Sequence, residues 1–229
     1  MASLLDNADK MGELGEFFIK CFGHFDFKGI TRKLPNSTFQ GETSRRVGDK
    51  EVKLFEVGPA HTNGDVIVFV PDDRVVFTGD ILFIEGHPIL WAGPVSNWID
   101  ACNKIISLDI ENVVPGHGPV TDKKGVEAVR DYLIYIHHEA KIRFDGGMEA
   151  LEACKDIDLK AFSSWGDSER IAVNINSLYR EFKGEEQRED ITLLFTQMAE
   201  LAKDNQLWKL NLSSFLIAVA LGLTLLLEK

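Results

Sequence analysis

Two histidines and one aspartate are candidate metal ligands, because each lies in a glycine-containing loop beside a predicted strand. His61 lies in GPAHTNGD, Asp80 in FTGD and His117 in VVPGHGPV. Imidazole nitrogen and carboxylate oxygen both bind zinc and other divalent transition metals. The neighbouring glycines allow the backbone to turn sharply and to approach a bound ion closely. The order and residue types therefore predict a metal site.

The predicted elements around these residues alternate between strands and helices. In chain order they are a strand over 50–57, a β-hairpin over 65–79 whose second strand is 74–78, a helix over 96–108, a strand over 111–114, and a helix capped by Asp122. Each candidate follows a strand, and ligands collect at strand ends in α/β sheets. We therefore expect the three side chains to meet at one edge of a sheet.

The remaining stretches have simpler patterns. The first twenty residues predict a helix, and 30–50 is polar and predicts loops with an edge strand. From 148 to 206 the pattern is helical, with Asp167 as a predicted cap.

The motifs GPAHTNGD, VVFTGDILF and VVPGHGPVTD, between Val52 and Thr121, resemble the second half of a metallo-β-lactamase-fold hydrolase. The resemblance implies an α/β fold: an αββα sandwich with metals at one sheet edge, incomplete here, and a helical C-terminal region. It implies one or two zinc ions, with His61 completing one zinc site, Asp80 bridging both metals and His117 in the second site. The implied activity is hydrolysis of an ester, thioester, lactone or amide bond of a small molecule by metal-bound hydroxide.

The first-half motif of that family, H-x-H-x-D-H, is absent from this sequence. The nearest stretch is FGHFDF, which keeps His24 and Asp26 but has phenylalanine at the other two ligand positions. GELGEFFIKC before it predicts a helix where the family has a strand, so we interpret the stretch as a loop. The sequence thus predicts an N-terminally shortened member with an incomplete metal site, weakly active or inactive. The alternative is an inactive relative or fragment that acts as a binding or membrane-anchored module.

We expect a partial metallo-β-lactamase-like domain over 1–206, with a motif-bearing core at 52–121 and a helical region at 122–206, and then a hydrophobic tail over 207–229. Residues 212–227, LSSFLIAVALGLTLLL, carry no charge, yet a spanning helix needs about 20 apolar residues. The tail is therefore predicted either to contact a membrane as an anchor, to bind a partner, or to form a buried helix. The N-terminus does not have the pattern of a signal peptide, which predicts a cytoplasmic rather than a secreted protein.

Composition limits the partner classes. The formal net charge is −11 and no basic stripe is present, which argues against nucleic acid as a partner. The three cysteines, Cys21, Cys102 and Cys154, are widely spaced and predict reduced, mostly buried thiols. The oligomeric state is not predicted.

Several other residues admit two interpretations. His87 either faces the same cleft as Asp80 or has a loop role, and Asp65 either orients His61 or caps a turn. His137 and His138 lie in a predicted helix, where their rings project about 100° apart, which is poor geometry for gripping one metal. Trp91 and Trp98 either line a pocket or pack in the core.

Overall fold

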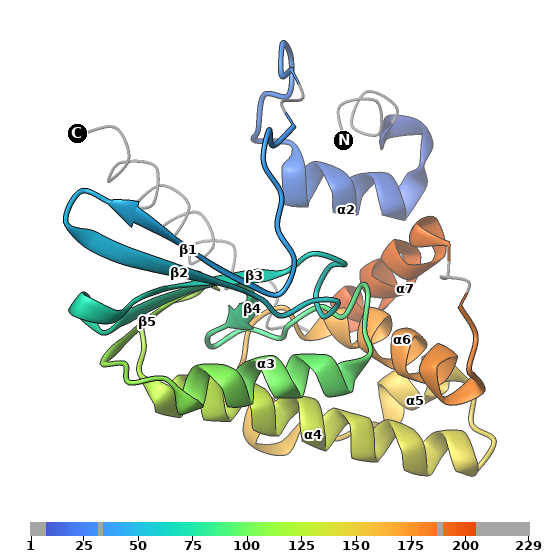
Figure 1. The fold of residues 1–229 in the computed structure, drawn as a ribbon. Helices are drawn as coiled ribbons and strands as arrows, with labels where there is room; N and C mark the ends of the chain where they lie inside the picture. The colour runs from blue at the N-terminus through green and yellow to red at the C-terminus, as the bar shows by residue number, and fades with distance from the viewer. Residues whose placement is uncertain (1–7, 32–33, 187–189, 205–229) are drawn as a thin grey trace.

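A five-stranded sheet with helices along one face forms the centre of the molecule (Figure 1). The structure, a computed structural model, describes residues 8–31, 34–186 and 190–204. Its elements are η1 (Ala8–Lys10), α2 (Gly12–Phe22), β1 (Glu42–Val47), β2 (Lys50–Glu56), β3 (Val66–Val70), η2 (Pro71–Asp73), β4 (Val75–Phe83), α3 (Val95–Ser107), β5 (Asn112–His117), α4 (Lys123–Asp145), α5 (Ala150–Asp156), η3 (Lys160–Phe162), η4 (Ser168–Arg170), α6 (Ile171–Lys183) and α7 (Ile191–Asp204).

The sheet order follows the chain order from β1 to β5. The pairs β1–β2, β2–β3 and β3–β4 are antiparallel, and β5 pairs parallel to β4. A parallel pair needs a crossover connection, which α3 provides here. The predicted hairpin, the edge strand β1 and the helix between the last two strands are confirmed.

The two faces of the sheet have different surroundings. Phe69, Val76 and Val113 lie opposite one another on adjacent strands and are buried in the main core. Side chains alternate between faces along a strand, so their neighbours in sequence form a second row on the opposite face. That row consists of Leu54, Val68, Phe77 and Val114 in direct register. In Figure 1, α3 and α4 lie together on one side of the sheet.

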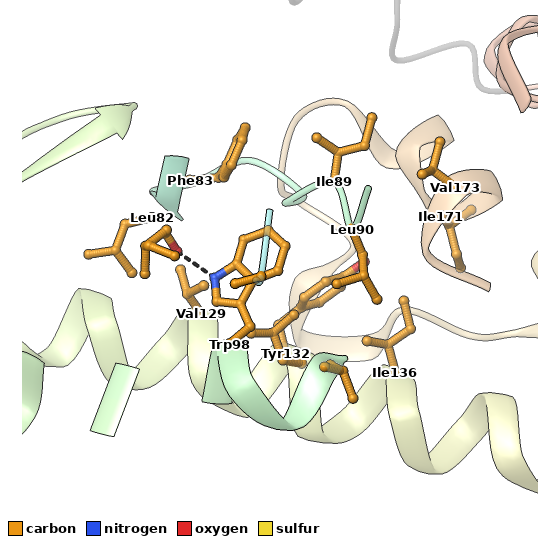
Figure 2. Close-up of a cluster of buried hydrophobic side chains, with 14 of the residues drawn as sticks. Leu82, Phe83, Ile89, Leu90, Trp98, Val129, Tyr132, Ile136, Ile171 and Val173 are labelled. Atoms are coloured by element: carbon orange, nitrogen blue, oxygen red, sulfur yellow. Dashed lines mark hydrogen bonds between the residues drawn. The ribbon is translucent and has the colours of Figure 1, made fainter. Parts of the chain in front are cut away.

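The core between the sheet and the helices is built around Trp98 of α3. Its side chain is fully buried, and its indole Nε1–H donates a hydrogen bond of 2.8 Å to the carbonyl of Ile81 in β4. Figure 2 shows Trp98 and Tyr132 between the end of β4 and α4. Buried aromatic side chains of this size contribute strongly to core packing, and the hydrogen bond fixes α3 against the strand that carries Asp80.

The helical C-terminal region is joined to the sheet through the segment after β4. Asn174 of α6 accepts a hydrogen bond from the amide of Leu90 at 2.8 Å and donates one to the carbonyl of Pro88 at 2.9 Å. The predicted cap of α4 is confirmed, because Asp122 accepts from the amide of Lys124. The predicted cap by Asp167 is wrong.

Asp167 has φ 60° and makes no side-chain capping bond. Its carboxylate instead lies 3.0 Å from the guanidinium of Arg170, three residues along the chain. The side chain of Asp167 therefore pairs with Arg170 and does not cap the helix.

The structure confirms the α/β class, with one sheet-and-helix half of a sandwich and a helical C-terminal region. The predicted tail over 207–229, with its apolar stretch 212–227, lies outside the described residues. None of the helices within the described ranges is long and apolar enough to cross a membrane. Cys21, Cys102 and Cys154 are free thiols, and the last two are buried.

Candidate functional site

The three predicted ligands come from neighbouring parts of the sheet. His61 lies in the loop after β2, Asp80 lies within β4, and His117 is the last residue of β5. The prediction that the second hairpin strand ends at Thr78 is wrong, because β4 continues to Phe83. The β4–β5 register shifts on both sides of Gly79, whose φ is +51°, so the strand is irregular next to Asp80.

Asp80 lies between the two histidines. Its Oδ2 is 3.5 Å from Nε2 of His61, and its Oδ1 is 3.2 Å from Nε2 of His117. The side chain of His61 is largely buried, whereas those of Asp80 and His117 are 45% and 38% exposed. Three residues from three loops or strands thus converge, and each carboxylate oxygen meets a different imidazole.

The ring of His61 is oriented by a backbone carbonyl. Its Nδ1 lies 2.7 Å from the carbonyl oxygen of Ile89, which can only accept, so Nδ1 carries the proton. Burial lowers the pKa of His61, partly offset by this hydrogen bond and by Asp80, so the neutral ring is favoured. The bare Nε2 of neutral His61 then faces a carboxylate oxygen.

The carboxylate of Asp80 is held in its charged form. The hydrogen bond from His117 lowers the pKa of Asp80, against the opposing effect of partial burial. Gly116 makes the close approach of this carboxylate possible. A Cβ at Gly116 would stand 2.6 Å from Oδ1 of Asp80 and 2.6 Å from the backbone of Gly79. Only glycine fits between β4 and β5 at this position.

The donor set matches zinc in chemistry and spacing but not in number. Zinc bonds of 2.0–2.2 Å at a tetrahedral angle place two ligand atoms about 3.4 Å apart. Both nitrogen–oxygen separations, 3.5 and 3.2 Å, are close to that value. The histidines face different oxygens rather than one shared point. Across the described ranges, no group of three or more His, Cys, Asp or Glu side chains is arranged to hold one ion.

Two of the residues with open interpretations have a structural role. His87 is completely buried and makes ring contacts with Tyr132 and Trp165, so it does not face a cleft shared with Asp80. Asp65 accepts hydrogen bonds from the amides of Ala60 and Thr62 and from the hydroxyl of Thr62. It caps the loop that carries His61.

Among the other sequence candidates, Trp98 contacts the site: its ring meets that of His61 edge-on, with centroids 5.9 Å apart. The interpretation of FGHFDF as a loop is confirmed: the ring of His24 packs on Phe25, and the carboxylate of Asp26 accepts from the amide of Lys28. The remaining four are a helical pair and two packed tryptophans: His137 and His138 on α4, Trp91 against Phe195, and Trp98 in the core.

Sequence reasoning missed two groups that contact the candidate ligands. These are the Ile89 carbonyl bound to His61, and the ring of Phe83, which stacks on His117. A backbone carbonyl has no sequence signature. Phe83 looks like an ordinary strand residue in FTGDILF, and only the β4–β5 register brings it beside His117.

A cavity of about 400 Å³ lies between β2 and α3, lined among others by Phe55, Glu56, Asp100 and Lys104. Its lining does not include the three candidate ligands. A molecule bound in this cavity would not contact His61, Asp80 or His117, so the cavity has no role in the chemistry of the candidate site.

About half of this chain is similar to metallo-β-lactamase proteins. The sequence profile of the Metallo-beta-lactamase superfamily matches residues 6–117, which include all three candidate ligands. A Beta-lactamase-like protein 2 homolog of Caenorhabditis elegans is 32% identical over 75 residues, 33% of this chain and 24% of that protein. A hydroxyacylglutathione hydrolase of Brucella ovis is 33% identical over 78 residues, 33% of this chain and 30% of that protein.

These matches span less than a third of the length of the two curated relatives. Among solved structures, the stereoselective inverting sec-alkylsulfatase Pisa1 of Pseudomonas sp. aligns with a TM-score of 0.51 and 13% identity. That alignment covers 66% of this chain and 27% of the sulfatase. At this identity the likeness concerns the fold alone.

Proposed function

We propose that this chain is a zinc-binding hydrolase of the metallo-β-lactamase superfamily whose metal ligands are His61, Asp80 and His117; the similarity over residues 6–117 supports this. One observation carries the proposal. The neutral His61 directs an electron pair on Nε2 toward an ionised carboxylate oxygen 3.5 Å away. Two electron-rich atoms so placed repel each other unless a cation lies between them.

The proposed roles follow from which atoms face each other. His61 and Asp80 would hold one ion, and His117 and Asp80 would hold the other, because each carboxylate oxygen faces a different imidazole. A bound zinc ion lowers the pKa of a coordinated water and so supplies hydroxide near neutral pH. The protein's own part is to keep the Asp80 carboxylate ionised and the His61 ring neutral and oriented by Ile89. The core at 52–121 carries all three ligands.

The proposed substrate is a small molecule with an ester, thioester, lactone or amide bond. The name of the Brucella relative favours a thioester within this group, because hydroxyacylglutathione is an acylated thiol. Each zinc ion would have two ligands among the described residues, whereas hydrolytic zinc sites generally use three protein ligands. We therefore expect weak zinc binding and low activity from this chain.

A second candidate function is a non-catalytic member that binds without hydrolysing. The observation in its favour is the same shortage of donors: within the described residues, no three side chains meet at one point. Hydrolysis and zinc binding must therefore be measured separately.

The test is zinc binding and hydrolysis by the full chain. Zinc content after equilibration with excess zinc and desalting, and the zinc Kd by chelator competition, are compared for wild type, Asp80→Asn and Asp109→Asn. Asp109 is a matched exposed aspartate that pairs with Arg74. We expect zinc binding by wild type and Asp109→Asn, and its loss in Asp80→Asn. No zinc in the wild type, or equal binding by Asp80→Asn, would contradict the proposal.

The hydrolysis measurement separates the two candidate functions. Zinc-loaded protein is offered a hydroxyacylglutathione, an aryl ester and a lactone. Turnover that is lost in Asp80→Asn supports the hydrolase. Zinc binding without turnover of any of the three supports the non-catalytic member.

A further inference from the structure

The ring of Phe83 is in contact with both candidate histidines. It stacks nearly parallel on His117, with centroids 4.2 Å apart and an interplanar angle of 9°. Its centroid is also 5.6 Å from that of His61, with the rings tilted by 48°. One aromatic side chain thus touches two imidazoles, one from the loop after β2 and one from the end of β5.

Phe83 is well placed to hold His117 because its own position is fixed. It is 1% exposed and is the last residue of β4. Its Cα is paired with that of His117 in the β4–β5 register, and the next amide, Ile84, donates to the carbonyl of His117 at 2.9 Å. In Figure 2, Phe83 lies on the side of the core cluster away from α4, beyond Trp98.

A cation from the helical region lies over the same ring. The guanidinium of Arg170, at the end of η4, is 5.2 Å from the Phe83 centroid. It is held by a 2.9 Å hydrogen bond to the carbonyl of His87 and by the ion pair with Asp167. A cation over an aromatic face is attractive and is strengthened where water is excluded. Arg170 therefore braces Phe83 from a segment outside the sheet.

We propose that Phe83 is a positioning residue for the metal ligands, with Arg170 as its brace; this rests on the proposed zinc-binding function. Metal-ligating histidines are normally oriented by a partner beyond the metal, often a carbonyl that accepts from the second ring nitrogen. His61 has such a partner in Ile89. For His117, the flat stack on Phe83 restricts rotation of the ring and keeps Nε2 directed at Asp80.

A purely structural role would make Phe83 one more core side chain. The two roles differ in what a leucine at this position changes. Leucine fills much of the space but has no flat face on which His117 can stack. If Phe83 positions the histidines, Phe83→Leu therefore disturbs their rings more than an ordinary core Phe→Leu substitution does. Phe69 of β3 is a matched control, since it is buried in the same sheet and faces the same core.

The experiment compares Phe83→Leu, Phe69→Leu and Arg170→Met in the full chain, after circular dichroism shows that each is folded. The first measurement is the histidine ring spectrum of the metal-free protein by carbon–proton NMR, with His117 assigned through His117→Gln. The Phe83 ring shields a stacked imidazole, so Phe83→Leu should move the His117 ring signals downfield and also shift those of His61. Arg170→Met should move them less, and Phe69→Leu should leave them in place.

The second measurement is zinc affinity. Loss of a group that orients a ligand typically weakens metal binding about 10- to 100-fold. We expect Phe83→Leu to raise the zinc Kd at least about tenfold, with less than about twofold for Phe69→Leu. If the His117 signals and the zinc Kd of Phe83→Leu match those of Phe69→Leu, the positioning role is overturned. If the wild type binds no zinc, the proposed function fails, and the metal-free spectra still decide whether Phe83 positions His117.

Discussion

His87 is a histidine held neutral in the protein core. Its side chain is completely buried; Nε2 lies 3.1 Å from the carbonyl of Phe162, and Nδ1 is buried without a hydrogen-bond partner. Burial lowers the pKa of His87 from 6.5 to about 4. As pH falls below 6.5, His87 becomes protonated in the unfolded chain, whereas in the folded chain it stays neutral until about pH 4. Stability must therefore fall as pH falls through this window.

We predict that His87→Leu flattens the pH dependence of unfolding between pH 6.5 and 4. A shift of about 2.5 pKa units corresponds to up to about 3 kcal/mol of stability lost over the window. Urea unfolding at several pH values measures it. His138, exposed on α4, provides the matched substitution His138→Leu. An equal slope for His87→Leu and wild type would contradict the prediction.

Gly116 is the residue that lets Asp80 approach His117. A methyl group there would meet both the Asp80 carboxylate and the backbone of Gly79 at 2.6 Å. We predict that Gly116→Ala displaces Asp80, abolishes zinc binding and costs about 1–3 kcal/mol of stability. Gly64→Ala, in the His61 loop, has open space at Cβ and should leave both unchanged. Zinc titration and urea unfolding test the pair, and zinc binding by Gly116→Ala would refute it.

Among the elements, α4 depends on its first-turn cap. Asp122 accepts a 2.8 Å hydrogen bond from the amide of Lys124, which otherwise has no helical partner. We predict that Asp122→Ala lowers the free energy of unfolding by about 1 kcal/mol. Asp131→Ala, an exposed substitution within the same helix, should be neutral or slightly stabilising because alanine favours helix. Thermal unfolding of both variants decides between these outcomes; equal effects would exclude the capping role.

The elements with strong local signals could be predicted from sequence, and those set by tertiary contacts could not. The cap at Asp122 and the turn after Val70 have turn and capping chemistry that acts within a few residues. The extension of β4 to Phe83 depends on pairing with a strand more than thirty residues later. Aspartate often caps helices, yet the side chain of Asp167 pairs with Arg170 and makes no capping hydrogen bond.

At the candidate site, the convergence of His61, Asp80 and His117 could be predicted because each stands beside glycines and next to or within a strand of one sheet. The orientation of the rings could not. It depends on the Ile89 carbonyl and on a register that stacks Phe83 on His117. These are contacts between segments whose sequences carry no sign of each other.

At the scale of the molecule, the sheet presents an apolar row that is not part of the main core. Leu54, Val68, Phe77 and Val114 lie side by side across β2 to β5, and Phe77 is 45% exposed. In Figure 1, α3 and α4 lie together on one side of the sheet. Contiguous exposed apolar surface promotes association with other apolar surfaces. Phe77, together with its half-buried neighbours in the row, should therefore promote self-association of the protein in solution.

We predict that Phe77→Thr reduces both self-association and binding of a hydrophobic dye, with threonine chosen because it keeps the preference for strand. Ile134→Gln is the matched control, since Ile134 is similarly exposed at 47% but stands on α4, outside the row. Sedimentation and dye fluorescence at equal concentrations measure the effect. We expect a clear decrease for Phe77→Thr and little change for Ile134→Gln, because one apolar residue outside a patch binds weakly. Equal signals from both variants would mean that the row is not an exposed apolar surface.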